Sequence, residues 1–258
     1  MRHGASWGAA ADDLGRVTIL GTGVDPVTKA EALDRAEALI RRGEPAQVVT
    51  INPELVMHAQ RDPAVAAALA RAALVVPDGI GIVWAARLLG RPVPERVPGI
   101  EFAEGLLHRA AVLGYRVFLL GAAPGVAEEA ARRLAARCPG LMVAGTHHGY
   151  FRPEDEAAVV EAIRRAQPHI LLVALGAPRQ ELWIARHLEA CRVPLAVGVG
   201  GSLDVFAGRV RRAPVWMQQV GLEWLYRLVR QPARAGRMLA LPQFALRVLL
   251  DVARRNLL

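Results

Sequence analysis

The chain has 258 residues, of which 53% are hydrophobic, and this is enough to bury the core of one large α/β domain or two small ones. Cys138 and Cys191 lie far apart, with no Cys-x-x-Cys or Cys/His spacing, which argues against a disulfide framework and against a zinc site of that type. The net charge is +8, and all of it belongs to residues 209–258, which hold ten arginines and two acidic residues. A basic block at one end of a chain indicates a surface for phosphates, either of nucleic acid or of anionic lipid.

The chain begins with residues 1–15, "MRHGASWGAAADDLG", which lack the long apolar stretch of a signal peptide. We expect this segment to be a flexible N-terminus. Because the cysteine usage also fits a reducing compartment, the sequence predicts a cytoplasmic protein.

Between residues 16 and 208, short apolar runs rich in β-branched residues alternate with segments of helical period. Parallel strands need helical crossovers, and these cover both faces of the sheet. The pattern therefore predicts a Rossmann-like α/β domain at 16–208, with a mostly parallel sheet and helices on both faces. The apolar runs are "RVTILG", "QVVTIN", "ALVVPDG", "YRVFLLG", "LMVAGTHH", "HILLVALG" and "LAVGVGG". The expected helices are 28–42, 53–71, 80–90, 100–113, 125–137, 154–166 and 178–190.

Ligands of such sheets bind beyond the carboxyl ends of the strands, so the residues that follow each apolar run are the candidates for a site. The first are "GTGVDP" at 21–26. They resemble the start of a dinucleotide fingerprint, which would fit an NAD(P)-dependent oxidoreductase, but the third glycine is missing. We favour a tight turn at Gly21 and Gly23.

The second and third runs end in short polar side chains. Thr50 and Asn52 of "VVTIN" suit a hydroxyl-rich ligand, or else they cap the end of the strand. Asp78 of "VVPDG" fits two roles, either a helix N-cap in an Asp-Gly turn or a general base at the mouth of an apolar pocket.

The proline-rich loop "RPVPERVPG" carries Arg91 and Arg96, which suit a phosphate or a carboxylate and equally suit an exposed surface. Gly121 opens the loop "GAAPG" before a helix, where free backbone N–H groups suit a diphosphate or simply begin the helix. The adjacent His147 and His148 would point to opposite faces of a strand, so we expect no metal site there.

Two further motifs follow the last runs of the sheet. Gln180 and Glu181 of "GAPRQE" lie at a helix start, where they suit recognition of a base or sugar, or else first-turn acids favoured by the helix dipole. Gly201 of "GVGGSLD" ends the last run at the same edge.

In residues 209–258, apolar residues recur at helical spacing and arginines occupy a different stripe. A further apolar helix, interrupted by Pro242 and Arg247, is expected near the C-terminus. No run reaches the roughly 18 apolar residues of a membrane-spanning helix. The pattern predicts a basic, amphipathic helical appendage that binds a membrane surface, with a nucleic-acid-binding module as the alternative.

Taken together, the motifs resemble the WecG/TagA/CpsF family of bacterial glycosyltransferases (glycosyltransferase family 26), from about Val17 to Arg237. The motifs that carry the resemblance occur in the family's order. They are "ILGTGVDPVTKAEAL", "TINPELV", "VVPDGIGIVWAARLLG", "RVPGIEF", "LLGAAPGVAEEAA", "GAPRQELWI", "GVGGSLDVFAG" and "RRAPVWMQQVGLEWLYRL".

The resemblance implies an inverting, metal-independent transferase without a cofactor. Such an enzyme moves N-acetylmannosamine, or its uronic acid, from a UDP-sugar to polyprenyl-diphosphate-linked N-acetylglucosamine, for a cell-surface polysaccharide or teichoic acid. The resemblance implies that Asp78 is the base on the acceptor hydroxyl, that Thr50 and Asn52 lie beside it, and that Arg96 contacts the acceptor or a phosphate. The substrate-binding residues would also include Gln180, Gly121 and Gly201.

The basic amphipathic segment at 209–258 predicts a peripheral enzyme on the inner leaflet, with an anionic membrane surface as partner and no nucleic acid. A homo-oligomer stays open. Leu203 and Glu101 depart from the family's usual phenylalanine and aspartate, which leaves the identity of the sugar open. The arginines expected to meet the acceptor diphosphate are Arg227, Arg230, Arg234 and Arg237.

Overall fold

The structure, a computed structural model, describes residues 15–219, 221, 223–230 and 239–255. Six strands form one sheet in the order β4-β3-β8-β7-β5-β6, and every neighbouring pair is parallel. The expectation of a mostly parallel α/β sheet is confirmed. The strands are β3 (Ala46–Ile51), β4 (Leu74–Pro77), β5 (Arg116–Gly121), β6 (Met142–His147), β7 (Ile170–Ala174) and β8 (Leu195–Gly198).

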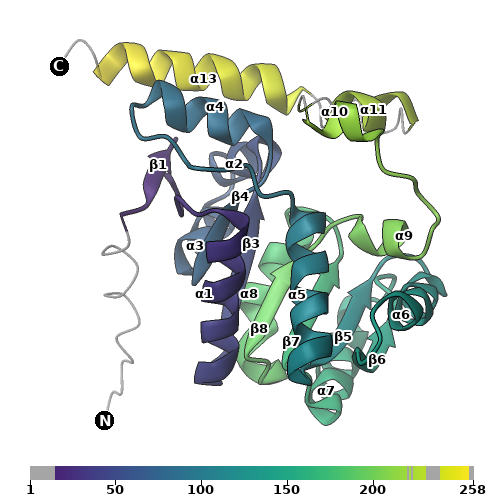
Figure 1. Cartoon of the computed structure of the whole chain (residues 1–258). Coiled ribbons are helices and arrows are strands. Elements are labelled where there is room, and N and C mark those ends of the chain that lie inside the picture. The colour runs from purple at the N-terminus through teal and green to yellow at the C-terminus, as the bar shows by residue number, and fades with distance from the viewer. Residues whose placement is uncertain (1–14, 220, 222, 231–238, 256–258) are drawn as a thin grey trace, which may run out of the picture.

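Helices cover both faces of this sheet (Figure 1). Successive strand residues point to opposite faces, so Val48 of β3 packs into the apolar cluster of one helix layer and Val49 into that of the other. One layer contains α1 (Lys29–Arg42), α5 (Gly99–Leu113), α6 (Val126–Arg137) and α9 (Ser202–Phe206). The other contains α2 (Pro53–Ala59), α3 (Pro63–Arg71), α7 (Glu156–Ala166), which follows the short 3-10 helix η2 (Pro153–Asp155), and α8 (Arg179–Cys191).

The first apolar run does not join the parallel sheet. It forms a separate antiparallel hairpin of β1 (Val17–Ile19) and β2 (Thr22–Val24), which turns at Leu20 and Gly21 in the left-handed region. The tight turn expected at Gly21 is confirmed, whereas Gly23 lies within β2 and pairs with Thr18, so the "GTGVDP" motif does not begin a dinucleotide-binding βαβ unit. Its Asp25 is fully buried, where it forms ion pairs with Arg16 and Arg35.

The segment expected as one helix at 53–71 is two helices. Asn52 caps α2 by accepting a hydrogen bond from the N–H of Leu55, and Asp62 caps α3 in the same way through Ala64. A proline follows each cap at the first helical position, where its missing N–H has no helical partner to lose. Pro63 thus begins a new helix instead of continuing the old one.

The C-terminal region contains α10 (Val215–Gln219), α11 (Glu223–Arg230) and α13 (Ala240–Arg255). Phe244 and Val248 of α13 are buried in the apolar cluster that also contains residues of α2 and of α4 (Ile80–Leu88). Figure 1 shows α13 lying across this end of the molecule. Pro242 does not interrupt α13 as expected, because it lies in the first turn of the helix.

Among the described residues, none of the helices combines the length and the apolar character needed to cross a bilayer.

Candidate active site

A cavity of ≈ 260 Å³ opens beyond the carboxyl ends of four neighbouring strands, β4, β3, β8 and β7. Seven candidate residues from the sequence analysis line it together: Thr50, Asn52, Asp78, Arg96, Gln180, Glu181 and Gly201. They gather because the carboxyl ends of parallel strands share one edge of the sheet. Five segments from distant parts of the chain thus build one site.

Gly121 lies outside the lining of this cavity. It ends β5 with φ +129°, and an added Cβ would lie 2.4 Å from the carbonyl oxygen of Ala174 on β7. The close approach of these two strands explains the glycine. The "GAAPG" loop that follows leads into α6 through Gly125, which is the N-cap in the left-handed region.

Thr50 and Asn52 flank the end of β3. The Thr50 hydroxyl donates a hydrogen bond of 3.4 Å to the carbonyl oxygen of Gly198, which connects β3 to β8 at the cavity wall. The Asn52 side-chain oxygen accepts a 3.0 Å hydrogen bond from the N–H of Leu55. Asn52 therefore caps α2 while it lines the cavity, and its role toward a ligand stays a prediction.

Asp78 follows β4 directly. Its N–H donates a 2.8 Å hydrogen bond to the carbonyl oxygen of Ile51, so the loop starts from a fixed position beside β3. The N-cap of α4 is Gly79, with φ +104° and no side-chain cap bond, so Asp78 is not the cap of that helix. Asp78 is half-buried at the cavity wall.

Gly99 shows how close the Asp78 and Thr50 side chains are to one another. An added Cβ on Gly99 would lie 2.9 Å from Thr50 Oγ1 and 3.4 Å from Asp78 Oδ2. The two side chains therefore converge on the first turn of α5. A side chain at Gly99 would collide with Thr50, so this close packing requires a glycine.

Gln180 and Glu181 begin α8 and are both buried. The Gln180 side-chain oxygen accepts a 3.0 Å hydrogen bond from the N–H of Gly200, and its amide donates at 2.7 Å to Glu181 Oε1. Gly198 must lack a side chain, because an added Cβ would lie 2.6 Å from Gln180 Nε2. These contacts hold both side chains in place at the end of β8.

Burial raises the pKa of Glu181 to about 7 from its ordinary 4.5. The hydrogen bond from Gln180 opposes this shift, and the negative charge of Glu54 adds to it. Glu54 lies in the first turn of α2 and also lines the cavity, 3.9 Å from His58 Nε2. The cavity therefore holds a carboxyl that is partly protonated near neutral pH.

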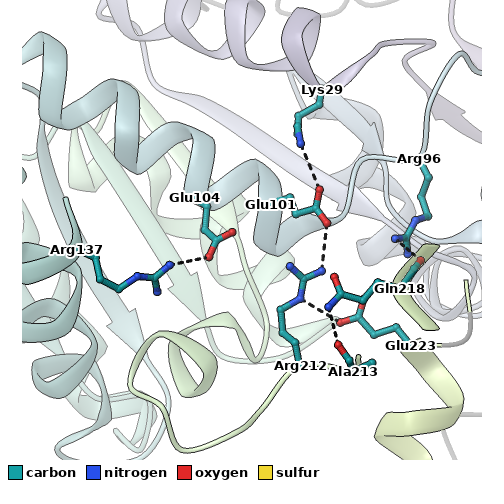
Figure 2. A network of polar contacts seen from close by, with 9 residues as sticks. All are labelled: Lys29, Arg96, Glu101, Glu104, Arg137, Arg212, Ala213, Gln218 and Glu223. Carbon is teal, nitrogen blue, oxygen red and sulfur yellow. Dashed lines mark hydrogen bonds and ion pairs between the residues drawn. The ribbon is translucent and has the colours of Figure 1, made fainter. Parts of the chain in front are cut away.

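The C-terminal region supplies another wall of the cavity. Gly221, Glu223 and Trp224 line it beside residues of the sheet edge. Arg96 donates a 3.1 Å hydrogen bond to the carbonyl oxygen of Gln218 on α10, which attaches this region to the loop before α5 (Figure 2).

Arg212 makes a second attachment, which Figure 2 shows beside the first. Its guanidinium pairs with Glu101 of α5 at 3.2 Å and with Glu223 of α11 at 3.7 Å. Lys29 pairs with the other oxygen of Glu101 at 3.3 Å. One arginine thus joins α5 to α11 through carboxylates that are mostly buried.

The four arginines expected to meet the acceptor diphosphate lie in this region. Arg227 and Arg230 are part of α11, but their side chains are outside the described part of the structure. Arg234 and Arg237 lie outside the described residues altogether. Their roles stay predictions.

Exposed apolar side chains occur on α4, α10 and α11 and on α13 and the residue before it, and these four helices lie together at one end of the molecule (Figure 1). Trp216 is 61% exposed, and Ile80 and Trp224 both border the cavity. We call these residues the apolar surface: Ile80, Trp84, Leu88, Val215, Trp216, Trp224, Leu225, Val229, Leu239, Leu246, Leu249 and Leu250. Because α4 belongs to the catalytic domain predicted at 16–208, this surface is not confined to the C-terminal segment.

Within the described ranges, no group of three or more His, Cys, Asp or Glu side chains is arranged to hold a metal ion.

Several residues that line the cavity were not predicted from the sequence as site residues. Glu54 could have been noticed, because "NPE" places an acid in the first turn of a capped helix that begins at a strand end. Glu223, Trp224 and Leu241 carry no such signal. They reach the cavity through packing between segments far apart in the chain.

The chain matches the family described as "Glycosyl transferase WecG/TagA/CpsF family" over residues 17–257. It is 40% identical to an N-acetylglucosaminyldiphosphoundecaprenol N-acetyl-beta-D-mannosaminyltransferase of Bacillus spizizenii. The aligned region of 204 residues covers 79% of this chain and 79% of the relative. It is 36% identical over 235 residues to a protein of the same name from Staphylococcus aureus (strain MW2), which covers 90% of this chain and 92% of the relative.

Proposed function

The chain belongs to the WecG/TagA/CpsF family of glycosyl transferases, and on this premise we propose that it transfers N-acetylmannosamine, or a related sugar or uronic acid, from a UDP-sugar. The acceptor is N-acetylglucosamine linked to a polyprenyl diphosphate. The product belongs to the synthesis of a cell-surface polysaccharide or teichoic acid. The expected family and the class of enzyme agree with the names of the relatives.

One observation supports this function most strongly. The side chains of Asp78 and Thr50 both line the cavity, and both lie against Gly99 at the start of α5. A carboxylate in such a position suits the task of taking the proton from an acceptor hydroxyl as that oxygen attacks the anomeric carbon of the donor sugar. Attack from the face opposite the departing UDP inverts the configuration at that carbon.

The departing UDP carries negative charge, which cationic and N–H donors must meet. Arg96 lines the cavity, and we assign it to a phosphate of the acceptor or donor. Its hydrogen bond to the Gln218 carbonyl already holds the guanidinium at the cavity wall. We assign the same task to one or more of Arg227, Arg230, Arg234 and Arg237, without a metal ion or cofactor.

We also propose that the apolar surface lies on the cytoplasmic leaflet of the membrane. A lipid-linked acceptor requires an active site near the bilayer, and Ile80 and Trp224 belong both to the apolar surface and to the cavity lining. Tryptophan prefers the membrane interface, and the arginines of residues 209–258 suit anionic lipid headgroups. The exposed aromatic and aliphatic residues favour lipid over nucleic acid as the partner.

The function is tested by mixing the full chain with UDP-N-acetylmannosamine and a short-chain prenyl-diphosphate N-acetylglucosamine in detergent. Mass spectrometry should detect the lipid-linked disaccharide. Parallel reactions with UDP-N-acetylmannosaminuronic acid and UDP-N-acetylglucosamine determine which sugar is preferred. Absence of a disaccharide with every donor would contradict the proposal.

A further inference from the structure

We propose that Glu181 is a substrate-binding residue whose neutral carboxyl donates a hydrogen bond to an uncharged oxygen of the donor sugar, either a hydroxyl or the N-acetyl carbonyl. This inference rests on the proposed function, because it assumes a nucleotide sugar in the cavity. The sequence alone allows Glu181 either to recognise a base or sugar or to be a first-turn acid favoured by the helix dipole. The proposed contact selects the first of these roles.

The first support is an unmet hydrogen-bonding group. Glu181 is 1% exposed and lines the cavity. Its Oε1 atom accepts from Gln180, whereas its Oε2 atom has no hydrogen-bond partner among the described residues. Buried polar atoms nearly always have a partner, since an unpaired one is costly. A ligand in the cavity would supply that partner.

The second support is the rigidity of the carboxyl's surroundings. Gln180 connects it to the N–H of Gly200, and Gln47 of β3 donates a 3.2 Å hydrogen bond to the Glu181 backbone carbonyl. An added Cβ on Gly198 would lie 2.8 Å from Glu181 Oε1, so β8 packs directly against the carboxyl. Side chains fixed from several elements are typical of binding sites that are formed before the ligand arrives.

The charge of the carboxyls on this wall indicates which part of the ligand they bind. Burial favours the protonated carboxyl, which can donate a hydrogen bond through Oε2. Glu54 faces the same group as a second carboxyl on the cavity wall. Two carboxyls suit an uncharged sugar oxygen better than a diphosphate, which Arg96 fits instead.

The test compares binding of UDP-N-acetylmannosamine and of UDP alone to the full chain by isothermal titration calorimetry. Glu181→Gln keeps a donor and an acceptor in the same shape, so it should bind both ligands within about threefold of the wild type. Glu181→Met removes the hydrogen-bonding group, so affinity for the UDP-sugar should fall by about tenfold or more. Affinity of the Met variant for UDP should change by less than about threefold.

A structural role would give a different result. If Glu181 served only to hold Gln180 and Gly200, the Met variant would lose affinity for UDP and the UDP-sugar equally, and that result would overturn the inference. Unchanged affinity of the Met variant for the UDP-sugar would overturn it as well. Thermal unfolding of each variant checks that the fold is retained.

The proposed function fails in a distinguishable way. A wild-type chain that binds none of the three UDP-sugars named above contradicts the proposed function, and this inference with it. A wild-type chain that binds the UDP-sugar, with equal losses for both ligands in the Met variant, contradicts the assignment of Glu181 alone.

Discussion

The two walls of the cavity are built in different ways. At the sheet edge, Asp78, Thr50 and Gln180 are fixed by short connections to strands that are buried on both faces. At the C-terminal wall, α10 and α11 are attached through the side chains of Arg96 and Arg212. The first wall is fixed by strands of the core, whereas the described contacts that hold α10 and α11 include the hydrogen bond of Arg96 and the ion pairs of Arg212.

This difference corresponds to the two tasks of the proposed reaction. Proton transfer needs groups held within a fraction of an ångström, which a sheet edge provides. The C-terminal wall includes Trp224 of the apolar surface, which we propose meets the membrane that holds the lipid-linked acceptor. Elements attached by few contacts open locally at lower free energy than core strands. The contrast between the walls can be tested in four ways.

The largest effect on stability is expected at the sheet edge, from Glu181. Its pKa is about 7 in the folded protein and about 4.5 when unfolded. Below pH 4.5 both states are protonated, and as pH rises toward 7 the unfolded state loses its proton first. The free energy of unfolding should therefore fall by about 3 kcal/mol between pH 4.5 and 8 because of this group.

Glu181→Gln replaces the titrating carboxyl with an amide that does not titrate, so this variant serves as the matched control. Chemical denaturation of both proteins at pH 4.5, 6 and 8 should show that the stability of the wild type, relative to the variant, falls as pH rises. Other titrating groups are common to both proteins and cancel. Parallel pH dependences of the two free energies of unfolding would mean that the pKa of Glu181 is the same in the folded and unfolded states, which would contradict the prediction.

The second effect is expected at the C-terminal wall. Arg212→Met removes the ion pairs to Glu101 and Glu223 that join α11 to α5. The free energy of local opening of α10 and α11 should fall by about 2 kcal/mol, because both carboxylates are largely buried. Hydrogen exchange should therefore accelerate in α10 and α11, whereas the amides of β3 and β7 stay protected.

Arg132→Met on α6 is the control for this variant. It removes an ion pair to Glu129 from a side chain that is 77% exposed, so exchange should be unchanged throughout the chain. If Arg212→Met accelerated exchange in β3 as strongly as in α10, the two walls would form one cooperative unit and the contrast between them would not hold.

The third effect concerns the apolar surface. Trp216→Ser should weaken binding to vesicles that contain anionic phospholipid by about tenfold, since burial of a large apolar side chain contributes about 1.5–3 kcal/mol. Co-sedimentation measures the change. Val112→Ser on α5 is the control, because Val112 is 84% exposed but is not part of the apolar surface. Equal losses for both variants would show that this surface is not the one that meets lipid.

The sheet-edge wall could be predicted from the sequence because it is built by strand ends, which follow a repeated pattern along the chain. Apolar runs end in Thr50, Asn52 and Asp78, and parallel strands bring such ends together. Gly121 also ends a strand, but β5 lies beyond β7 in the sheet, and its conformation serves the close contact with Ala174. Strand ends can be read from the sequence, whereas the order of the strands depends on the whole fold.

The C-terminal wall could be predicted only in outline. Its helical and basic character is visible in the sequence, but the Arg96–Gln218 contact joins residues separated by 122 positions. The burial of Phe244 of α13 among α2 and α4 is equally distant in the chain. No local pattern encodes such pairings, because they depend on how finished elements pack.

The hairpin was missed for a different reason. Its two strands have three residues each, which is too short for an alternating pattern to distinguish an antiparallel pair from one strand of a larger sheet.

The central claim is that Asp78 acts as the base in a sugar transfer at the sheet edge. The most direct test is the steady-state rate of disaccharide formation by Asp78→Asn, whose side chain keeps the shape of the carboxylate but cannot take the proton. We predict that kcat falls by about 100-fold to 10 000-fold, with KM for the UDP-sugar within about threefold of the wild type. Turnover near the wild-type rate, in a variant that is correctly folded, would contradict the claim.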